Sequence, residues 1–195
     1  MKNKTIVILT LLLISAASAV TSCKDAGDDM LKIMNEDSFT SSYLGREFHG
    51  VWTVDGVLAD SCTMQVTPAG QLVFDTMPWK KLVMLTQAAA DKNLSESDLE
   101  IDEASKYTVI YHSTGYSSSS QYNRVDPKDY GFAYSSHGEW HSVRVVMAQD
   151  PVFVVDYQNA TVAVKFYVAQ IYDNQTEALK AGKQSVVITY QANLK

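Results

Sequence analysis

From Arg46 onward, short runs of alternating hydrophobic and polar residues recur between turn signals, a pattern typical of an antiparallel β protein. In the run Ser61–Thr67, for example, Cys62, Met64 and Val66 share one face, and the polar residues share the other. We therefore predict Cys62 to be a core residue. The predicted strands are Phe48–Asp55, Ser61–Thr67, Leu72–Thr76, Tyr107–Tyr111, Tyr130–Ser135, Trp140–Met147, Val152–Tyr157, Val162–Tyr172 and Val186–Gln191.

About eight or nine strands joined mostly by short links predict an all-β, mainly antiparallel fold, either a single barrel or a two-sheet sandwich. One short helix is expected over Trp79–Ala90, because Pro78 stands near its start and its apolar residues recur three and four apart. Asp91–Ala104 is charged and polar, and predicts a loop with a short helical turn. A single helical turn is also predicted over Thr176–Ala181, ended by Gly182.

The first 22 residues have the layout of an export signal. Lys2 and Lys4 supply a positive start, Ile6–Ile14 is almost continuously apolar, and Ser15–Ser22 consists mainly of small residues. The apolar run is about half of the roughly 20 residues that a membrane-spanning helix needs. We therefore expect residues 1–22 to be removed as a signal peptide.

Val20-Thr21-Ser22-Cys23 resembles the lipobox of bacterial lipoproteins, in which an aliphatic residue and two small residues precede the lipidated cysteine. The resemblance implies a diacylglycerol on the Cys23 thiol and a third acyl chain on its amine, which together attach the protein to a membrane. Each buried methylene contributes about 0.8 kcal/mol, so several chains hold more durably than one. The alternative is ordinary cleavage near Ala19, which leaves Cys23 as a free thiol.

Residues 23–44 form the expected lipidated terminus and flexible tether, and residues 45–195 the single β-rich domain. The stretch Lys24–Asp29 resembles the charged export tag of surface-displayed lipoproteins of the Bacteroidetes type, although Ala26-Gly27 interrupts it. This resemblance implies an outer-membrane protein that is exposed at the cell surface. A domain facing the periplasm is the alternative.

The chain of 195 residues has a formal charge of -6, with 22 Asp and Glu against 16 Lys and Arg. Loss of Lys2 and Lys4 with the leader makes the mature chain more acidic still. A protein that binds nucleic acid non-specifically needs a basic face, so no nucleic-acid partner is expected. Two cysteines are too few for a disulfide-built scaffold.

The sequence nominates no catalytic residue, no metal site and no cofactor. His137 and His141 flank Glu139 but fall in a predicted hairpin, where residues four apart are about 13 Å from each other and cannot share one ion. Gly-x-Ser-x-Gly elbows and glycine-rich phosphate loops are absent from the sequence. A hydrolase whose carboxylates meet only in the fold stays open as an alternative.

The strongest binding signal lies between Tyr111 and Asn123, where tyrosines stand among serine, glycine and asparagine without a formal charge. Binding surfaces favour this composition, because the ring is rigid and the small polar residues adapt around it. The opposite interpretation places the rings in the core and the serines in a solvated loop. The candidate ligand-binding residues are Tyr111, Tyr116, Tyr122, Tyr130, Tyr134 and Trp140.

Gly50-Val51-Trp52 resembles the Gly-x-Trp element of lipocalin-like (calycin) barrels, and the overall layout resembles lipoproteins of unknown function from gut Bacteroidetes. Asp75-Thr76-Met77 also resembles the O-glycan acceptor tripeptide of that phylum. The first hypothesis is a non-catalytic binding module at the cell envelope with a glycan or protein ligand. The alternatives are a calycin-like carrier of a small apolar ligand and the hydrolase above.

Overall fold

The computed structural model describes residues 42–101, 106–116, 120–179 and 186–194, without the side chains of residues 113–116. The predicted leader, the lipobox with Cys23 and nearly all of the tether lie outside the described residues. Within the described ranges, no helix has both the length and the apolar composition to span a bilayer.

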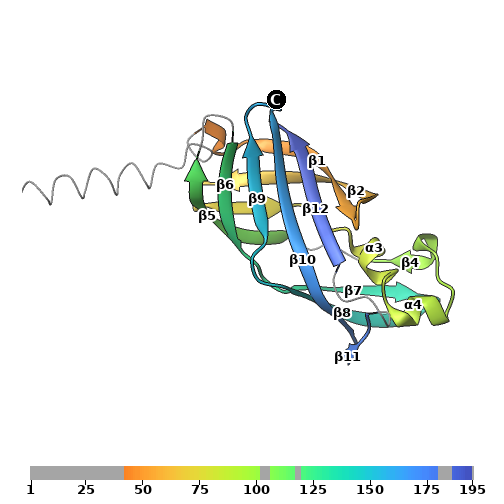
Figure 1. Ribbon diagram of the computed structural model, residues 1–195. Coiled ribbons are helices and arrows are strands. Elements are labelled where there is room, and N and C mark those ends of the chain that lie inside the picture. The colour runs from red at the N-terminus through yellow and green to blue at the C-terminus, as the bar shows by residue number, and fades with distance from the viewer. Residues whose placement is uncertain (1–41, 102–105, 117–119, 180–185, 195) are drawn as a thin grey trace, which may run out of the picture.

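Eight antiparallel strands close into a barrel, which confirms the predicted all-β class (Figure 1). Each strand pairs with the next around the barrel, and β12 pairs with both β10 and β1 to complete the circle. In spatial order the strands are β1 (Glu47–Val54), β2 (Val57–Thr67), β3 (Gln71–Phe74), β5 (Tyr107–Tyr116), β6 (Ser120–Asp126), β9 (Val152–Asp156), β10 (Thr161–Asp173) and β12 (Val186–Asn193).

The strand β10 is shared by the barrel and a side sheet, which continues the same hydrogen-bonded sheet. Its first half, Thr161–Val168, pairs with β12 inside the barrel, and its second half, Val168–Asp173, pairs with β8 (Glu139–Met147). A register shift between Val168 and Gln170 marks the change of partner. Beyond β8 the sheet continues through β7 (Tyr130–Ser136) to β4 (Leu99–Glu100), and β11 (Thr176–Glu177) also pairs with β10. Figure 1 shows this side sheet extending from the lower end of the barrel.

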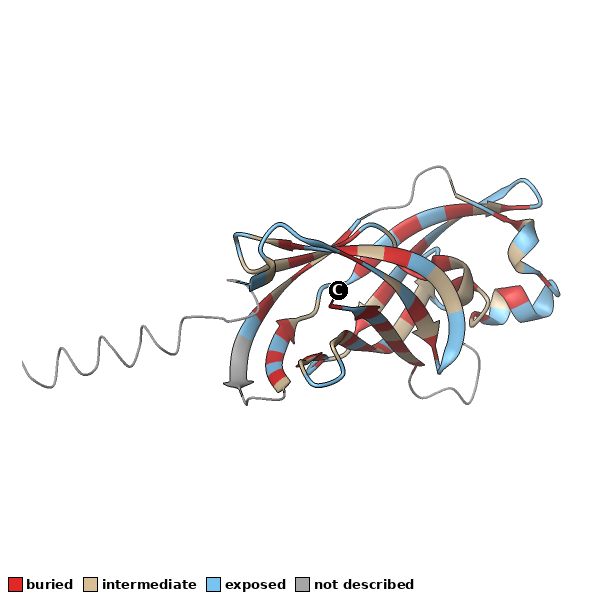
Figure 2. Ribbon diagram, turned by 90° about the horizontal axis from the view of Figure 1, so that it is seen from above, coloured by how far each residue is buried: buried red, intermediate tan, exposed pale blue. Residues whose placement is uncertain are grey.

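Alternation along the strands directs one set of side chains into the barrel, as the banding in Figure 2 shows. The interior is filled by large rings. The Trp52 ring lies 5.0 Å from that of Phe74 and 5.3 Å from that of Tyr190, and Phe74 also contacts Phe166. All four side chains are fully buried.

Thr86 divides the segment that we predicted as one helix. The structure has two short helices, α3 (Trp79–Val83) and α4 (Gln87–Asp91). Thr86 is extended between them, and its hydroxyl caps α4 by accepting from the Ala89 N–H at 3.2 Å. A 3-10 turn, η1 (Glu96–Asp98), follows within the predicted loop.

The helical turn predicted over Thr176–Ala181 is also corrected. Thr176–Glu177 form β11, and Leu179 makes an isolated antiparallel bridge to Thr86. Residues 180 and 181 lie outside the described residues. Backbone hydrogen bonds to β10 and to Thr86 therefore outweigh the local helical pattern here.

Candidate functional site

A pocket of about 530 Å³ opens on the outer face of the side sheet. Its described lining consists of Ser142 and Arg144 from β8, Tyr172 from β10, and Gln175 from the turn that leads to β11. Tyr172 lies directly opposite Arg144 in the β10–β8 register, so their side chains share one face. The pocket thus offers a guanidinium, an aromatic ring, an amide and a hydroxyl within one concave surface.

The Arg144 guanidinium stacks on the Tyr172 ring, with its central carbon 4.7 Å from the ring centroid. Stacking of this kind attracts the cation to the ring face and fixes the direction of its N–H donors. The carboxylate of Asp129 lies 4.0 Å from the guanidinium, at the limit of ion-pair distance. On β7 the residue opposite Arg144 is Gly131, which adds no side chain, and the side chain of Arg144 is 60% exposed. Its donors are therefore available to a ligand.

The turn Asn174–Gln175 forms one edge of the pocket. Both residues have positive φ, 48° and 67°, as the two central residues of a type I′ hairpin turn require. Asn174 is bonded twice to Ser142: its backbone N–H donates to the Ser142 carbonyl at 2.8 Å, and its side-chain oxygen accepts from the Ser142 N–H at 3.0 Å. These bonds fix the position of Gln175 relative to β8.

A buried polar pair lies on the opposite face of the same strands. His141 Nδ1 is 3.0 Å from both carboxylate oxygens of Asp173, and both side chains are about nine-tenths buried. The Tyr134 ring stacks on the imidazole at 4.7 Å, and its hydroxyl lies 3.5 Å from Asp173. Burial raises the pKa of Tyr134, and the negative charge of Asp173 acts in the same direction. The phenol therefore stays protonated and can donate to Asp173.

This pair is enclosed. The Nε2 atom of His141 and the hydroxyl of Ser136 are both buried, and neither has a hydrogen-bond partner in the part of the chain that the structure describes. A general base must come within hydrogen-bond reach of its substrate. In this structure the pair connects β8 to β10, and its second imidazole nitrogen is out of contact with solvent.

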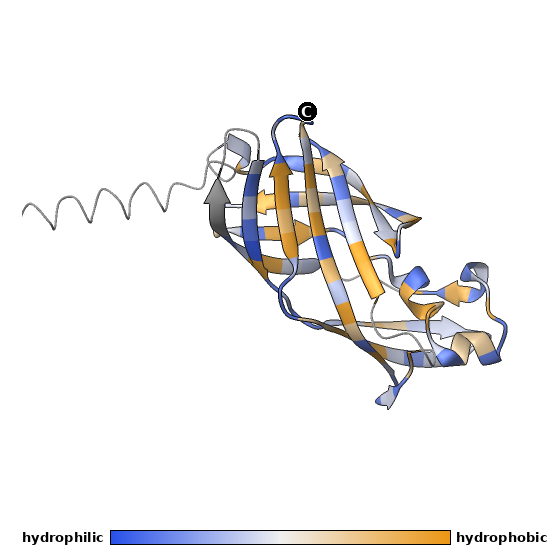
Figure 3. Ribbon diagram, in the orientation of Figure 1, coloured by the Kyte–Doolittle hydropathy of each residue, from blue (hydrophilic) through white to orange (hydrophobic). Residues whose placement is uncertain are grey.

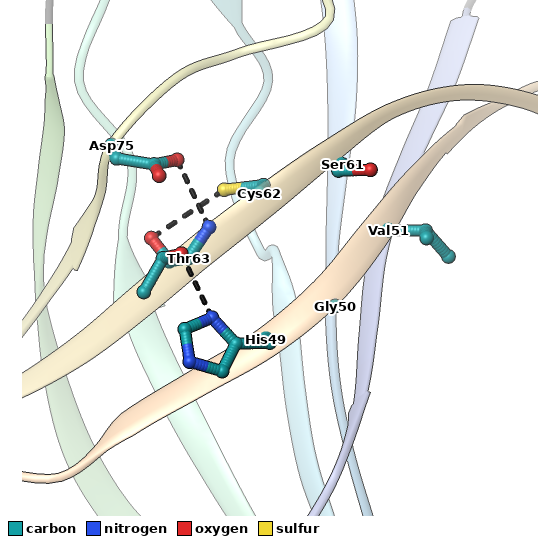
Figure 4. Close-up of a pocket in the computed structure, with 7 residues that line it drawn as sticks. All are labelled: His49, Gly50, Val51, Ser61, Cys62, Thr63 and Asp75. Carbon is teal, nitrogen blue, oxygen red and sulfur yellow. Dashed lines mark hydrogen bonds between the residues drawn. The ribbon is translucent and has the colours of Figure 1, made fainter.

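A second, more open pocket of about 300 Å³ lies on the outer wall of the barrel (Figure 4). Two neighbouring strands contribute to it: β1 with His49, Gly50 and Val51, and β2 with Ser61, Cys62 and Thr63. Asp75, which follows β3, completes the lining, and one of its carboxylate oxygens accepts from the Thr63 N–H at 3.0 Å. His49 Nδ1 lies 3.1 Å from the Thr63 hydroxyl.

Cys62 lines that pocket but is a core residue, as its place in the alternating strand predicts. Burial raises the pKa of the Cys62 thiol to about 12. The thiol also donates a hydrogen bond to the Thr76 carbonyl, 3.4 Å away. The negative charge of Asp75 raises the thiol pKa further. Because the thiolate is the nucleophile, Cys62 has little nucleophilic character.

The structure separates the six candidate binding residues. Tyr111, Tyr130 and Tyr134 are buried in the core, which matches the core interpretation of these rings. Two others are exposed: Tyr122 on β6 at 54% and Trp140 on β8 at 58%. They lie in different parts of the molecule, one on the barrel and the other at the β7–β8 hairpin of the side sheet. The side chain of Tyr116 lies outside the described residues.

The sequence offers only a faint signal for Arg144 and Tyr172. Each occupies an outward position in an alternating strand, which on its own is typical of a solvated surface. Only the register between β8 and β10 brings them together. In the described ranges, no three His, Cys, Asp or Glu side chains are grouped so that they could hold a metal ion.

Comparison of the chain with models of protein families, with curated proteins and with solved structures gives no match. The geometry of the two pockets and of the buried pair therefore carries the functional argument.

Proposed function

We propose that this chain is a lipoprotein of the bacterial outer membrane, exposed at the cell surface, that binds a glycan without catalysing a reaction. The ligand site is the pocket over β8 and β10. The observation that carries this proposal is the stacking of Arg144 on Tyr172, which places oriented donors and an aromatic ring beside a pocket of about 530 Å³. Pockets of this size accommodate small ligands.

A glycan suits this lining because a sugar ring combines an apolar C–H face with hydroxyl groups around its edge. The part of the Tyr172 ring that Arg144 does not cover offers apolar area to the face of the sugar. The Gln175 amide and the Ser142 hydroxyl each donate and accept, and the Arg144 guanidinium adds charged donors. The four lining side chains therefore complement both parts of a sugar.

The charges around the pocket favour a neutral glycan. Arg144 faces Asp129 on one side, and Glu177 lies directly opposite Tyr172 on the other. These two carboxylates offset the single cation, so a polyanionic sugar would meet repulsion on either side of Arg144. The hydroxyl groups of a neutral sugar can accept hydrogen bonds from the guanidinium and donate hydrogen bonds to the carboxylates.

A glycan screen followed by calorimetry tests the proposal. We expect the chain from Cys23 to Lys195 to bind a neutral oligosaccharide, and Arg144→Gln or Tyr172→Ala to weaken it by about 10-fold or more. Arg124→Gln is the matched control, because Arg124 is also an exposed arginine paired with an aspartate but lies on β6. Absence of any glycan binding, or equal loss in the Arg144 and Arg124 variants, would reject the proposal.

The anchor is tested separately in living cells. Labelled palmitate should enter the wild-type chain and not a Cys23→Ser variant, since the acyl chains are proposed to be attached at that residue. An external protease should then remove the domain from intact cells if it faces outward. Protection of the domain would place it in the periplasm, and absence of label would remove the lipoprotein assignment.

A further inference from the structure

The pocket on the outer wall of the barrel has a chemistry different from that of the β8–β10 pocket. Among its described lining residues the one formal charge is the Asp75 carboxylate, since no lysine or arginine contributes. No described cation lies within ion-pair distance of Asp75. Its negative charge is nevertheless felt by its neighbours, because it contributes to the raised pKa values of both Cys62 and Tyr190. The pocket thus contains a carboxylate without a counter-ion.

Hydrogen bonds hold this carboxylate in place. One oxygen, Oδ1, accepts from the Thr63 N–H at 3.0 Å, and the Asp75 N–H donates to the Thr63 carbonyl at 3.0 Å. Figure 4 shows the carboxylate beside Thr63, with its second oxygen outside the drawn hydrogen bonds. Besides the Thr63 N–H, the carboxylate interacts with the Cys62 thiol, and its remaining lone pairs can accept from a ligand.

The remaining polar groups of the lining add acceptors around the carboxylate. The Ser61 and Thr63 hydroxyls come from neighbouring positions on the outward face of β2. When His49 Nδ1 donates to the Thr63 hydroxyl, its Nε2 becomes a further acceptor. The Cys62 thiol remains protonated at neutral pH and adds no charge.

We propose that this pocket binds a primary ammonium group, presented either by an amino sugar or by a lysine side chain. An ammonium group has three donors and no acceptor, which complements a lining of one carboxylate, two hydroxyls and an imidazole. The exposed side chain of Val51 offers apolar contact to the carbon atoms beside the ammonium group. This site is independent of the proposed glycan site, because the two pockets share no lining residue.

Titration followed by NMR tests the proposal on the mature chain, Cys23–Lys195. The probes are glucosamine and Nα-acetyl-lysine methylamide, and their controls are the same molecules with the amine acetylated. We expect at least one amine to shift the Thr63 backbone amide saturably, because that amide donates to Asp75. The acetylated controls should leave it unchanged. Glucosamine alone would identify an amino sugar as the source, and the lysine derivative alone a peptide.

Variants complete the test. Asp75→Asn keeps an oxygen for the Thr63 N–H but removes the charge, and should weaken amine binding about fivefold or more. Asp150→Asn is the matched control, an exposed aspartate outside the pocket, and should bind as the wild type does. Arg144→Gln should also leave amine binding intact, which separates this result from any failure of the glycan proposal. Saturable binding by neither amine, equal binding of the acetylated probes, or an unaffected Asp75→Asn variant would overturn the proposal.

Discussion

His141 and Asp173 connect β8 to β10 directly behind the β8–β10 pocket, with Nδ1 3.0 Å from each carboxylate oxygen. The residues next to them in sequence, Ser142 and Tyr172, point to the opposite face and line the pocket. Since a carboxylate can only accept, the Nδ1 atom carries the hydrogen of this bond. The buried pair thus adds a side-chain connection to the backbone pairing of the two lining strands, on the face opposite the pocket.

Replacing His141 by Leu should destabilise the protein, because it leaves the buried Asp173 carboxylate with only the Tyr134 hydroxyl, 3.5 Å away, as a donor. Removing one partner of a buried hydrogen bond typically costs about 1–3 kcal/mol, and more when the remaining group is charged; urea unfolding measures this loss. Hydrogen exchange should also accelerate at the Ser142 and Asn174 amides, which bond across the same two strands.

The control for this prediction is His141→Asn, whose side-chain amide can still donate to Asp173 from a position close to that of Nδ1. It should recover part of the lost stability and slow the exchange again. Equal stability of the wild type and the Leu variant would mean that the pair contributes no net free energy.

Gly50 is predicted to be the least replaceable glycine of the barrel. A Cβ atom at this position would lie 2.4 Å from the Gln191 carbonyl oxygen and 2.7 Å from the Tyr190 ring. The ring has little freedom to move, because its hydroxyl donates to the Phe48 carbonyl at 2.6 Å. Gly50→Ala must therefore displace β12 from β1, and we expect a loss of about 3 kcal/mol or more in thermal or urea unfolding.

Gly131→Ala provides the comparison for that substitution. A Cβ atom at Gly131 meets only the Val143 carbonyl oxygen, at an ordinary distance of 3.8 Å. We expect this variant to stay within about 0.5 kcal/mol of the wild type. Similar losses at both positions would show that close approach to Tyr190 is not the cause.

The alternation of the sequence predicts much of the barrel correctly, because most strands bury one apolar face. Each of the nine predicted strands corresponds to an observed one, with ends that differ by a few residues. Three strands of the described part of the chain have no predicted counterpart: β4 and β11, which have two residues each, and the longer β6, whose inward positions include Gln121 and Asn123. Figure 3 shows β6 as hydrophilic along most of its length. The Gln121 amide donates to Asn123 at 2.9 Å. Because both inward side chains are polar, a hydropathy pattern does not identify the inner face of this strand.

The candidate sites could not be predicted in the same way, because they depend on contacts between distant segments. Asp173 reaches His141 across 32 residues of chain, and Asp75 reaches Thr63 from the end of a different strand. Alternation indicates which face a residue occupies but not which strand lies beside it. The change of partner along β10, from β12 to β8, determines both the pocket and the buried pair.

The free energy of unfolding should fall in alkaline solution, because buried thiol and phenol groups stay protonated in the folded chain while the same groups ionise in the unfolded chain. Burial raises the pKa of the Cys62 thiol from 9.0 to about 12, and those of Tyr107 and Tyr130 from 10.0 to about 12. A folded-state pKa above the unfolded value means that the unfolded chain loses its proton first. The contribution of the buried Cys62 thiol to stability is therefore complete below pH 9 and disappears as the pH rises toward 12. Each such group contributes a slope of up to about 1.4 kcal/mol per pH unit.

Urea unfolding between pH 7 and pH 11 measures this decline, and Cys62→Ala should flatten it at its lower end, where the thiol is the first group to ionise. The native thiol should also react slowly with a disulfide reagent at pH 8 and quickly once the chain is unfolded. Rapid reaction in the folded state, or a stability that is independent of pH, contradicts the burial of this thiol.

Filling the β8–β10 pocket should abolish glycan binding without harming the fold. Ser142 is exposed, and its contacts to Asn174 use backbone atoms of Ser142, so a larger side chain leaves those bonds in place. Ser142→Tyr projects a ring into the space beside Arg144 and Tyr172, and we expect affinity for the glycan to drop more than 10-fold with unchanged unfolding free energy. Ser142→Ala removes only one hydroxyl, so its affinity should fall by less than about 10-fold. If Ser142→Tyr binds as tightly as Ser142→Ala, the ligand occupies another part of the surface and the pocket assignment is wrong.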